Sequence, residues 1–143
     1  MGWCSMNGTV EDPLAWRNFA DEDLHAARVL STSEDAEALA HIVTFHAHQA
    51  VEKYLKGLLV AYGEEPPRIQ VLPELLRRAT RYVSDLDKRE LRSAVINLHD
   101  YYVPSRYPAE VGGPTGPITS EEATEAIAWA EEITAAVRPR LDG

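Results

Sequence analysis

The sequence predicts an all-α fold, an antiparallel up-and-down helical bundle of four long helices plus one shorter helix. Apolar residues recur at helical spacing along most of the chain, no segment alternates apolar and polar residues as strands do, and most connections are short. The 143 residues suffice for one domain with its own core. We expect a flexible tail over residues 1–11, the bundle over residues 12–138 and a second tail over residues 139–143.

Capping signals mark the first two helices. Asp12 followed by Pro13 is typical of a helix start, so we expect a first helix from there to about residue 30. A turn rich in Ser and Thr follows, and we expect the second helix over residues 35–62. Gly63 is a natural residue to end it, because glycine adopts the left-handed conformation without strain.

The third and fourth helices are expected over residues 72–83 and 85–101. Pro73 suits the first turn of the third helix, where no main-chain donor is needed. We expect the fourth helix to stop before Pro104, because proline disfavours helical geometry at the residue that precedes it.

Residues 103–118 are rich in proline and glycine and are predicted to be a long irregular stretch. A loop of this length in a compact domain is usually functional or disordered. Thr119 and Glu122 then have the spacing of a capping box, so a final helix is predicted from there to about Val137.

Charge and cysteine content limit the function classes. The net charge of −9 argues against broad, nonspecific binding of nucleic acid but leaves room for a small basic cleft. The single cysteine, Cys4, rules out an internal disulfide and favours a reducing cytoplasm. We expect a cytoplasmic protein with no signal peptide, no membrane span and no cofactor. The basic residues gather in one region, as a cleft or as ordinary helix surface charge: Arg77, Arg78, Arg81, Lys88, Arg89 and Arg92.

The second predicted helix carries a polar row. His46, Gln49, Lys53 and Lys56 are spaced by three, four and three residues, which places them on one helical face. An imidazole, an amide and two ammonium groups in a row could bind an anion such as a nucleotide phosphate. The alternative is a solvated or dimer-lining face. We call this set the predicted polar row.

Four segments follow one another in a recognisable order. They are the helix at residues 45–59, the Gly-Glu-Glu-Pro-Pro-Arg loop at 63–68, the Leu-Pro-Glu-Leu-Leu helix start at 72–76 and the Tyr-rich run at 101–108 that ends in Arg-Tyr-Pro. Over residues 12–137 the chain thereby resembles HEPN domains of the small stand-alone prokaryotic type, a family associated with nucleotide binding. It departs from the family after Arg68, where apolar residues replace a polar run.

The resemblance implies a homodimer whose cleft is lined by the Tyr-rich run and which binds a nucleotide or the phosphate of RNA. It also implies a toxin-like component of a toxin–antitoxin pair, with a minimal nucleotidyltransferase as the antitoxin partner. The activity would then be metal-independent RNA cleavage. The alternative is a non-catalytic nucleotide-binding or protein-assembly module.

Arg92 and His99 are the candidate catalytic residues. They are seven residues apart, so a helix places them on one face about 10 Å apart along the axis. The spacing resembles that of HEPN ribonucleases, in which the histidine would do acid–base work and the arginine would stabilise charge on the phosphate. Both residue types suit that chemistry. The alternative is a surface or interface histidine.

Tyr101, Arg106 and Tyr107 are further candidates for ligand binding. A guanidinium beside aromatic rings can hold a phosphate while a base stacks. Arg106 could instead tie the loop to the bundle, and the tyrosines could pack on it. We expect no metal site, since His41 and His48 share a face without a carboxylate to complete a tight ligand set.

Overall fold

A computed structural model describes residues 11–106 and 118–142. Within them the chain forms helices and no strand, which confirms the predicted all-α class with four long helices and one shorter helix. None of these helices is long and apolar enough to cross a membrane. The elements are α1 (Pro13–Ser31), α2 (Ala40–Ala61), α3 (Leu72–Thr80), the 3-10 helix η1 (Ser84–Leu86), α4 (Arg89–Arg106), α5 (Ser120–Val137) and the 3-10 helix η3 (Arg138–Leu141).

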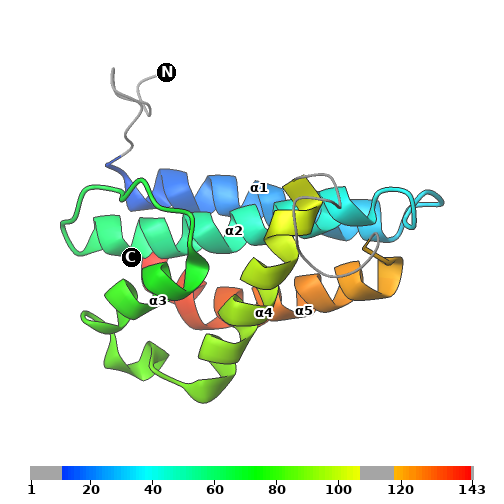
Figure 1. The fold of residues 1–143 in the computed structure, drawn as a ribbon. Coiled ribbons are helices and arrows are strands. Elements are labelled where there is room, and N and C mark those ends of the chain that lie inside the picture. Colours follow the sequence, from blue (N-terminus) through cyan, green and yellow to red (C-terminus); the bar gives the residue numbers. More distant parts are fainter. Residues whose placement is uncertain (1–10, 107–117, 143) are drawn as a thin grey trace.

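The second helix, α2, lies at the centre of the bundle. It packs against each of the other four α-helices and most extensively against α1. Figure 1 shows α1, α2 and α5 running alongside one another, while α4 crosses them obliquely and α3 covers the carboxyl-terminal half of α2. Most residues of α2 are therefore buried against a neighbouring helix, and the buried polar side chains need partners there.

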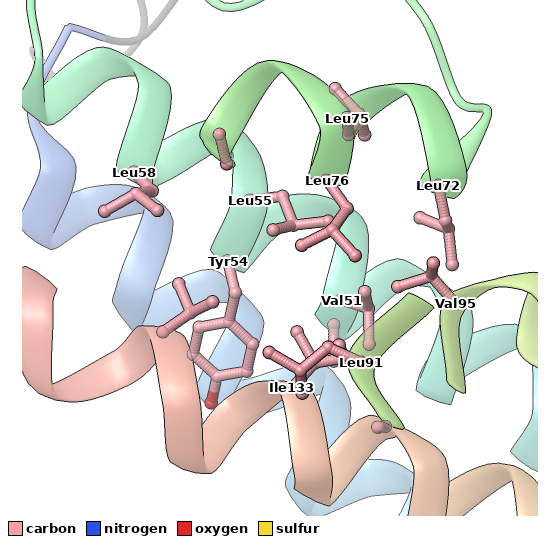
Figure 2. Close-up of a cluster of buried hydrophobic side chains, with 14 of the residues drawn as sticks. Val51, Tyr54, Leu55, Leu58, Leu72, Leu75, Leu76, Leu91, Val95 and Ile133 are labelled. Atoms are coloured by element: carbon pink, nitrogen blue, oxygen red, sulfur yellow. The ribbon is translucent and has the colours of Figure 1, made fainter. Parts of the chain in front are cut away.

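The main core lies between α2, α3, α4 and α5. Figure 2 shows leucines of α3 pointing down onto α2, with side chains of α4 and α5 closing the cluster from the other side. Burying each such side chain stabilises the fold by about 1.5–3 kcal/mol. The labelled members are Val51, Tyr54, Leu55, Leu58, Leu72, Leu75, Leu76, Leu91, Val95 and Ile133.

The predicted start of the first helix and the predicted end of the second are confirmed. Asp12 caps α1, since its Oδ1 accepts a hydrogen bond from the Leu14 main-chain N–H at 3.0 Å. Gly63 follows α2 with a φ of 93°, a value that suits glycine. The Glu64 N–H bonds to the Leu59 carbonyl at 3.0 Å, which completes a Schellman end.

The predicted start of the second helix is wrong. Helix α2 begins at Ala40 rather than at residue 35, and residues 34–39 form turns. In this segment the Glu37 carboxylate accepts a hydrogen bond from the Ser120 hydroxyl at 2.8 Å. It thereby sits at the amino terminus of α5, where a negative charge is favourable.

Two predicted boundaries of the fourth helix are also wrong. Helix α4 begins at Arg89, because residues 84–86 form η1 instead. It continues through Pro104 to Arg106, so Arg106 ends a helix and does not lie in a loop. Pro104 lies in the last turn of α4, where it lacks the N–H that would bond to the main-chain carbonyl four residues earlier.

The capping box before the last helix is confirmed. Thr119 accepts a hydrogen bond from the Glu122 N–H, and the Glu122 side chain accepts one from the Thr119 N–H. After α5, the segment that we expected to be a tail forms η3, and its Leu141 is buried in the core. Residues 107–117, which make up most of the predicted irregular stretch, lie outside the described residues.

Candidate functional site

A pocket of about 340 Å³ lies between α3 and α4. Arg77 and Thr80 approach it from α3, and Arg92 approaches it from α4. The remaining lining is apolar apart from Asp87: Pro73, Leu76, Val95 and Ile96. Two guanidinium groups beside an apolar surface can hold an anionic ligand that also has a flat or apolar part. We call this the α3–α4 pocket.

Both arginines of the pocket already have carboxylate partners. Arg92 pairs with Asp87, and Arg77 donates to Glu74, with its Nε 2.9 Å from Oε1. Hydrogen bonds from Arg77 and then from Arg78 lower the pKa of Glu74 to about 2. The two arginine side chains are more than half exposed, and exposed ion pairs contribute little stability. An incoming phosphate can therefore replace these carboxylates at small cost.

His99 has different surroundings from Arg92. It is partly buried, and its Nδ1 lies 3.4 Å from Nε2 of the fully buried His48 of α2. The Arg92 side chain reaches back to Asp87, because side chains on a helix lean toward its amino terminus. The two candidate catalytic residues share a face of α4 with Ile96 between them.

The predicted polar row is partly occupied by carboxylates. Asp23 of α1 bridges two of its members, with Oδ1 2.8 Å from His46 Nδ1 and Oδ2 2.6 Å from Lys53 Nζ. Lys56 is buried and donates to Glu52 at 2.9 Å, while Gln49 is partly buried. A phosphate at this row would compete with the Asp23 carboxylate, which ties α1 to α2.

Sequence reasoning missed a second polar row on α2. Thr44, His48, Glu52 and Lys56 follow one another at intervals of four residues and are all buried, between 0% and 8% exposed. We call this set the buried polar row. The interval of four was visible in the sequence, but burial was not, because it depends on α4 lying across α2. In the sequence, His48 stands out only as a possible metal ligand beside His41.

Comparison with known proteins assigns the family. The family model described as the HEPN domain matches residues 14–140. The chain belongs to the HEPN domain family.

Solved structures agree with the assignment. This HEPN domain superposes with a TM-score of 0.70 on the crystal structure of TT1696 from Thermus thermophilus, at 29% identity over 89% of this chain and 96% of that one. It also superposes with a TM-score of 0.70 on the crystal structure of ST0689, an archaeal HEPN homologue, at 26% identity over 91% and 98% of the two chains. No curated protein matches.

The Tyr-rich run of this HEPN domain is described in part. The Tyr101 ring packs edge-on against Trp129 of α5, with centroids 5.3 Å apart, and its hydroxyl lies 3.5 Å from Glu122. Burial, followed by the Glu122 charge, raises the pKa of Tyr101. Tyr101 therefore contacts α5, Arg106 is the last residue of α4, and Tyr107 lies outside the described residues.

The segment before α3 in this HEPN domain contacts the main core. Val71 is the N-cap residue, and no side chain caps the helix. Ile69 packs against the main core. Within residues 11–106 and 118–142, no three His, Cys, Asp or Glu side chains gather where they could hold a metal ion.

Proposed function

We propose that this HEPN protein binds a nucleotide or the phosphate of RNA along the face of α4, with the α3–α4 pocket as the main contact. The pocket itself is the observation that carries the proposal. Its volume of about 340 Å³ is within the range of small-molecule sites, about 300–1,000 Å³. Two arginines from different helices can grip phosphate oxygens in a two-pronged manner.

We also propose that the protein cleaves RNA and acts with a partner. A phosphate held by Arg92 would place the neighbouring ribose farther along α4, toward His99, which would do the acid–base work of metal-independent RNA cleavage. The chain would act as the toxin-like component of a pair whose antitoxin is a minimal nucleotidyltransferase. We further propose a homodimer whose cleft is lined by residues 101–108, with the predicted polar row contributing through His46, Gln49, Lys53 and Lys56.

A non-catalytic nucleotide-binding or assembly module is the second candidate. The observation that favours it is the direction of Arg92, which reaches toward Asp87, while His99 packs inward on His48. An arginine and a histidine that do not converge can bind a ligand together without cleaving it.

Binding is tested by titrating a fluorescent RNA oligonucleotide at low salt into wild type and two variants. Arg92→Ala should weaken binding about tenfold or more, since a lost charge-assisted contact is worth about 1.5–3 kcal/mol. Arg28→Ala is the matched control, because Arg28 is also 52% exposed and also paired with a carboxylate, but on the α1–α5 side. Equal weakening of RNA binding by both variants, or no weakening by either, would refute the α3–α4 pocket as the binding site.

Cleavage is followed in the same samples with a metal chelator present. His99→Ala should reduce cleavage by about 10²- to 10⁴-fold while leaving RNA binding in place. RNA that is bound but not cleaved by wild type would support the non-catalytic module instead.

A further inference from the structure

The buried polar row contains a buried carboxylate, that of Glu52. Glu52 is 6% exposed, and burying a carboxylate costs several kcal/mol unless good partners surround it. Its Oε2 accepts from Lys56 Nζ at 2.9 Å. Its Oε1 accepts no hydrogen bond in the described part of the chain and lies 3.9 Å from His48 Nδ1.

The position of this carboxylate favours one tautomer of the neutral His48 ring, the one with its proton on Nδ1. A proton on Nδ1 points the positive end of the N–H toward Glu52 Oε1, whereas a lone pair there would point at a negative oxygen. His48 therefore carries its proton on Nδ1 and a lone pair on Nε2. That lone pair faces His99 Nδ1 at 3.4 Å.

The tautomer of His48 determines the tautomer of His99. Since Nε2 of His48 is an acceptor, Nδ1 of His99 is the donor and carries the proton of that ring. The other nitrogen of His99, Nε2, then holds the lone pair and is a base. Carboxylates that orient a catalytic histidine by one ring nitrogen and leave the other basic act in the same way.

We propose that Glu52 and His48 are positioning residues that hold His99 in its Nδ1–H form. The inference rests on the proposed function. His99 Nε2 takes the proton of a 2′-hydroxyl, the O2′–phosphorus bond forms, the phosphorus–O5′ bond breaks, and the departing O5′ takes a proton from water. DNA lacks the 2′-hydroxyl that this step requires.

The test reads the ring protons directly, by two-bond ¹H–¹⁵N correlation spectra of the full-length ¹⁵N-labelled protein. At about pH 8.5, above the ordinary histidine pKa of about 6.5, wild-type His99 should be in the Nδ1–H form. Glu52→Gln should move most of the His99 population to the Nε2–H form. Wild-type His99 in the Nε2–H form would overturn the proposal even if no variant folds, and so would an unchanged population in a folded Glu52→Gln protein.

Asp23→Asn is the matched control. It removes a carboxylate that lies 2.8 Å from another histidine of α2, His46, and should leave the form of His99 unchanged. A shift of His99 in Asp23→Asn as large as that in Glu52→Gln would mean a general loosening of α2 and would also overturn the proposal.

Cleavage assays separate this inference from the proposed function. If wild type cleaves RNA, Glu52→Gln should cleave about 10- to 100-fold more slowly, and a substrate with 2′-deoxyribose at the cleavage site should resist both proteins. Cleavage at the wild-type rate by Glu52→Gln would refute the positioning role alone. The expected form of His99 without any RNA cleavage would refute the ribonuclease and leave the ring assignment standing.

Discussion

Single carboxylates of α1 hold several elements together. Asp21 accepts hydrogen bonds from Arg138 Nε and Nη2, both at 2.9 Å, and from the Tyr54 hydroxyl. Burial raises the pKa of Asp21, but the hydrogen bonds from Arg138 and Tyr54 and the Arg138 charge outweigh it, so the pKa is lowered. One charged side chain thus joins α1 to α2 and to the start of η3.

Replacing Asp21 should make the protein less stable in a pH-dependent way. A lowered folded-state pKa means that Asp21 adds stability above its unfolded pKa of about 3.9 and loses that contribution as the pH falls through the folded value. Asp21→Asn should lower the free energy of unfolding by about 1–2 kcal/mol at neutral pH. The difference from wild type should shrink below about pH 4.

Urea unfolding at several pH values measures this effect. Glu131→Gln is the control, because Glu131 is 45% exposed and its pairing with Arg28 should contribute little. A difference between Asp21→Asn and wild type that stays constant from neutral pH to about pH 2 would contradict the assignment.

At the scale of single side chains, the sequence revealed which residue types could act but not which ones meet. The spacing in α2 correctly put His46 and Lys53 on one side, yet their shared partner Asp23 lies 23 and 30 residues earlier. The contact between His48 and His99 joins residues 51 apart. Such pairings follow from how helices cross, and helical periodicity within one segment carries no information about that.

At the scale of elements, α1 and α2 approach each other closely at Gly57. A Cβ built on Gly57 would lie 2.8 Å from the Cβ of Trp16, nearer than real Cβ atoms come to other atoms. Because the Trp16 Cβ is attached directly to the main chain, it cannot give way without moving α1. Glycine here serves close helix packing rather than an unusual backbone angle.

Gly57→Ala should therefore destabilise the protein. Alanine favours a helix over glycine by about 1 kcal/mol, but overpacking costs about 1–3 kcal/mol, and the second effect should win. Thermal unfolding should give a lower midpoint than wild type. Ala128→Gly, at an exposed position in α5, is the control and measures the difference in helix propensity alone. A Gly57→Ala protein more stable than wild type would show that α1 can move away from α2 at little cost and would contradict the prediction.

Element boundaries were predictable where the signal is local. The Asp12 cap, the Gly63 stop and the Thr119 capping box each depend on residues within a few positions of one another. The start of α2 was missed, and the segment before it contacts a residue 83 positions later, where Glu37 accepts a hydrogen bond from Ser120. The run of α4 through Pro104 was missed because a proline rule states a preference that the last turn of a helix can override.

At the scale of the whole molecule, we predict a homodimer that uses the α4 face. Light scattering should give about twice the chain mass of 15.9 kDa. Ile96 is 48% exposed and lies on α4 between Arg92 and His99, so Ile96→Asp should yield monomers by placing a charge in the interface. Val29→Asp is the control, since Val29 is similarly exposed, at 52%, but belongs to α1. A wild-type monomer at every concentration would contradict the prediction.

The pairing of α1 with α2 has a consequence for the order of folding. These helices are adjacent in sequence and share the most extensive helix–helix contact, so they can meet after closing a short loop. Contacts of low sequence separation form fastest, and we expect the α1–α2 hairpin to be present in the folding transition state. The contacts of α2 with α4 and α5 bridge much longer stretches of chain and should form later. The contact between His48 and His99, which joins α2 to α4, should therefore form after the α1–α2 hairpin.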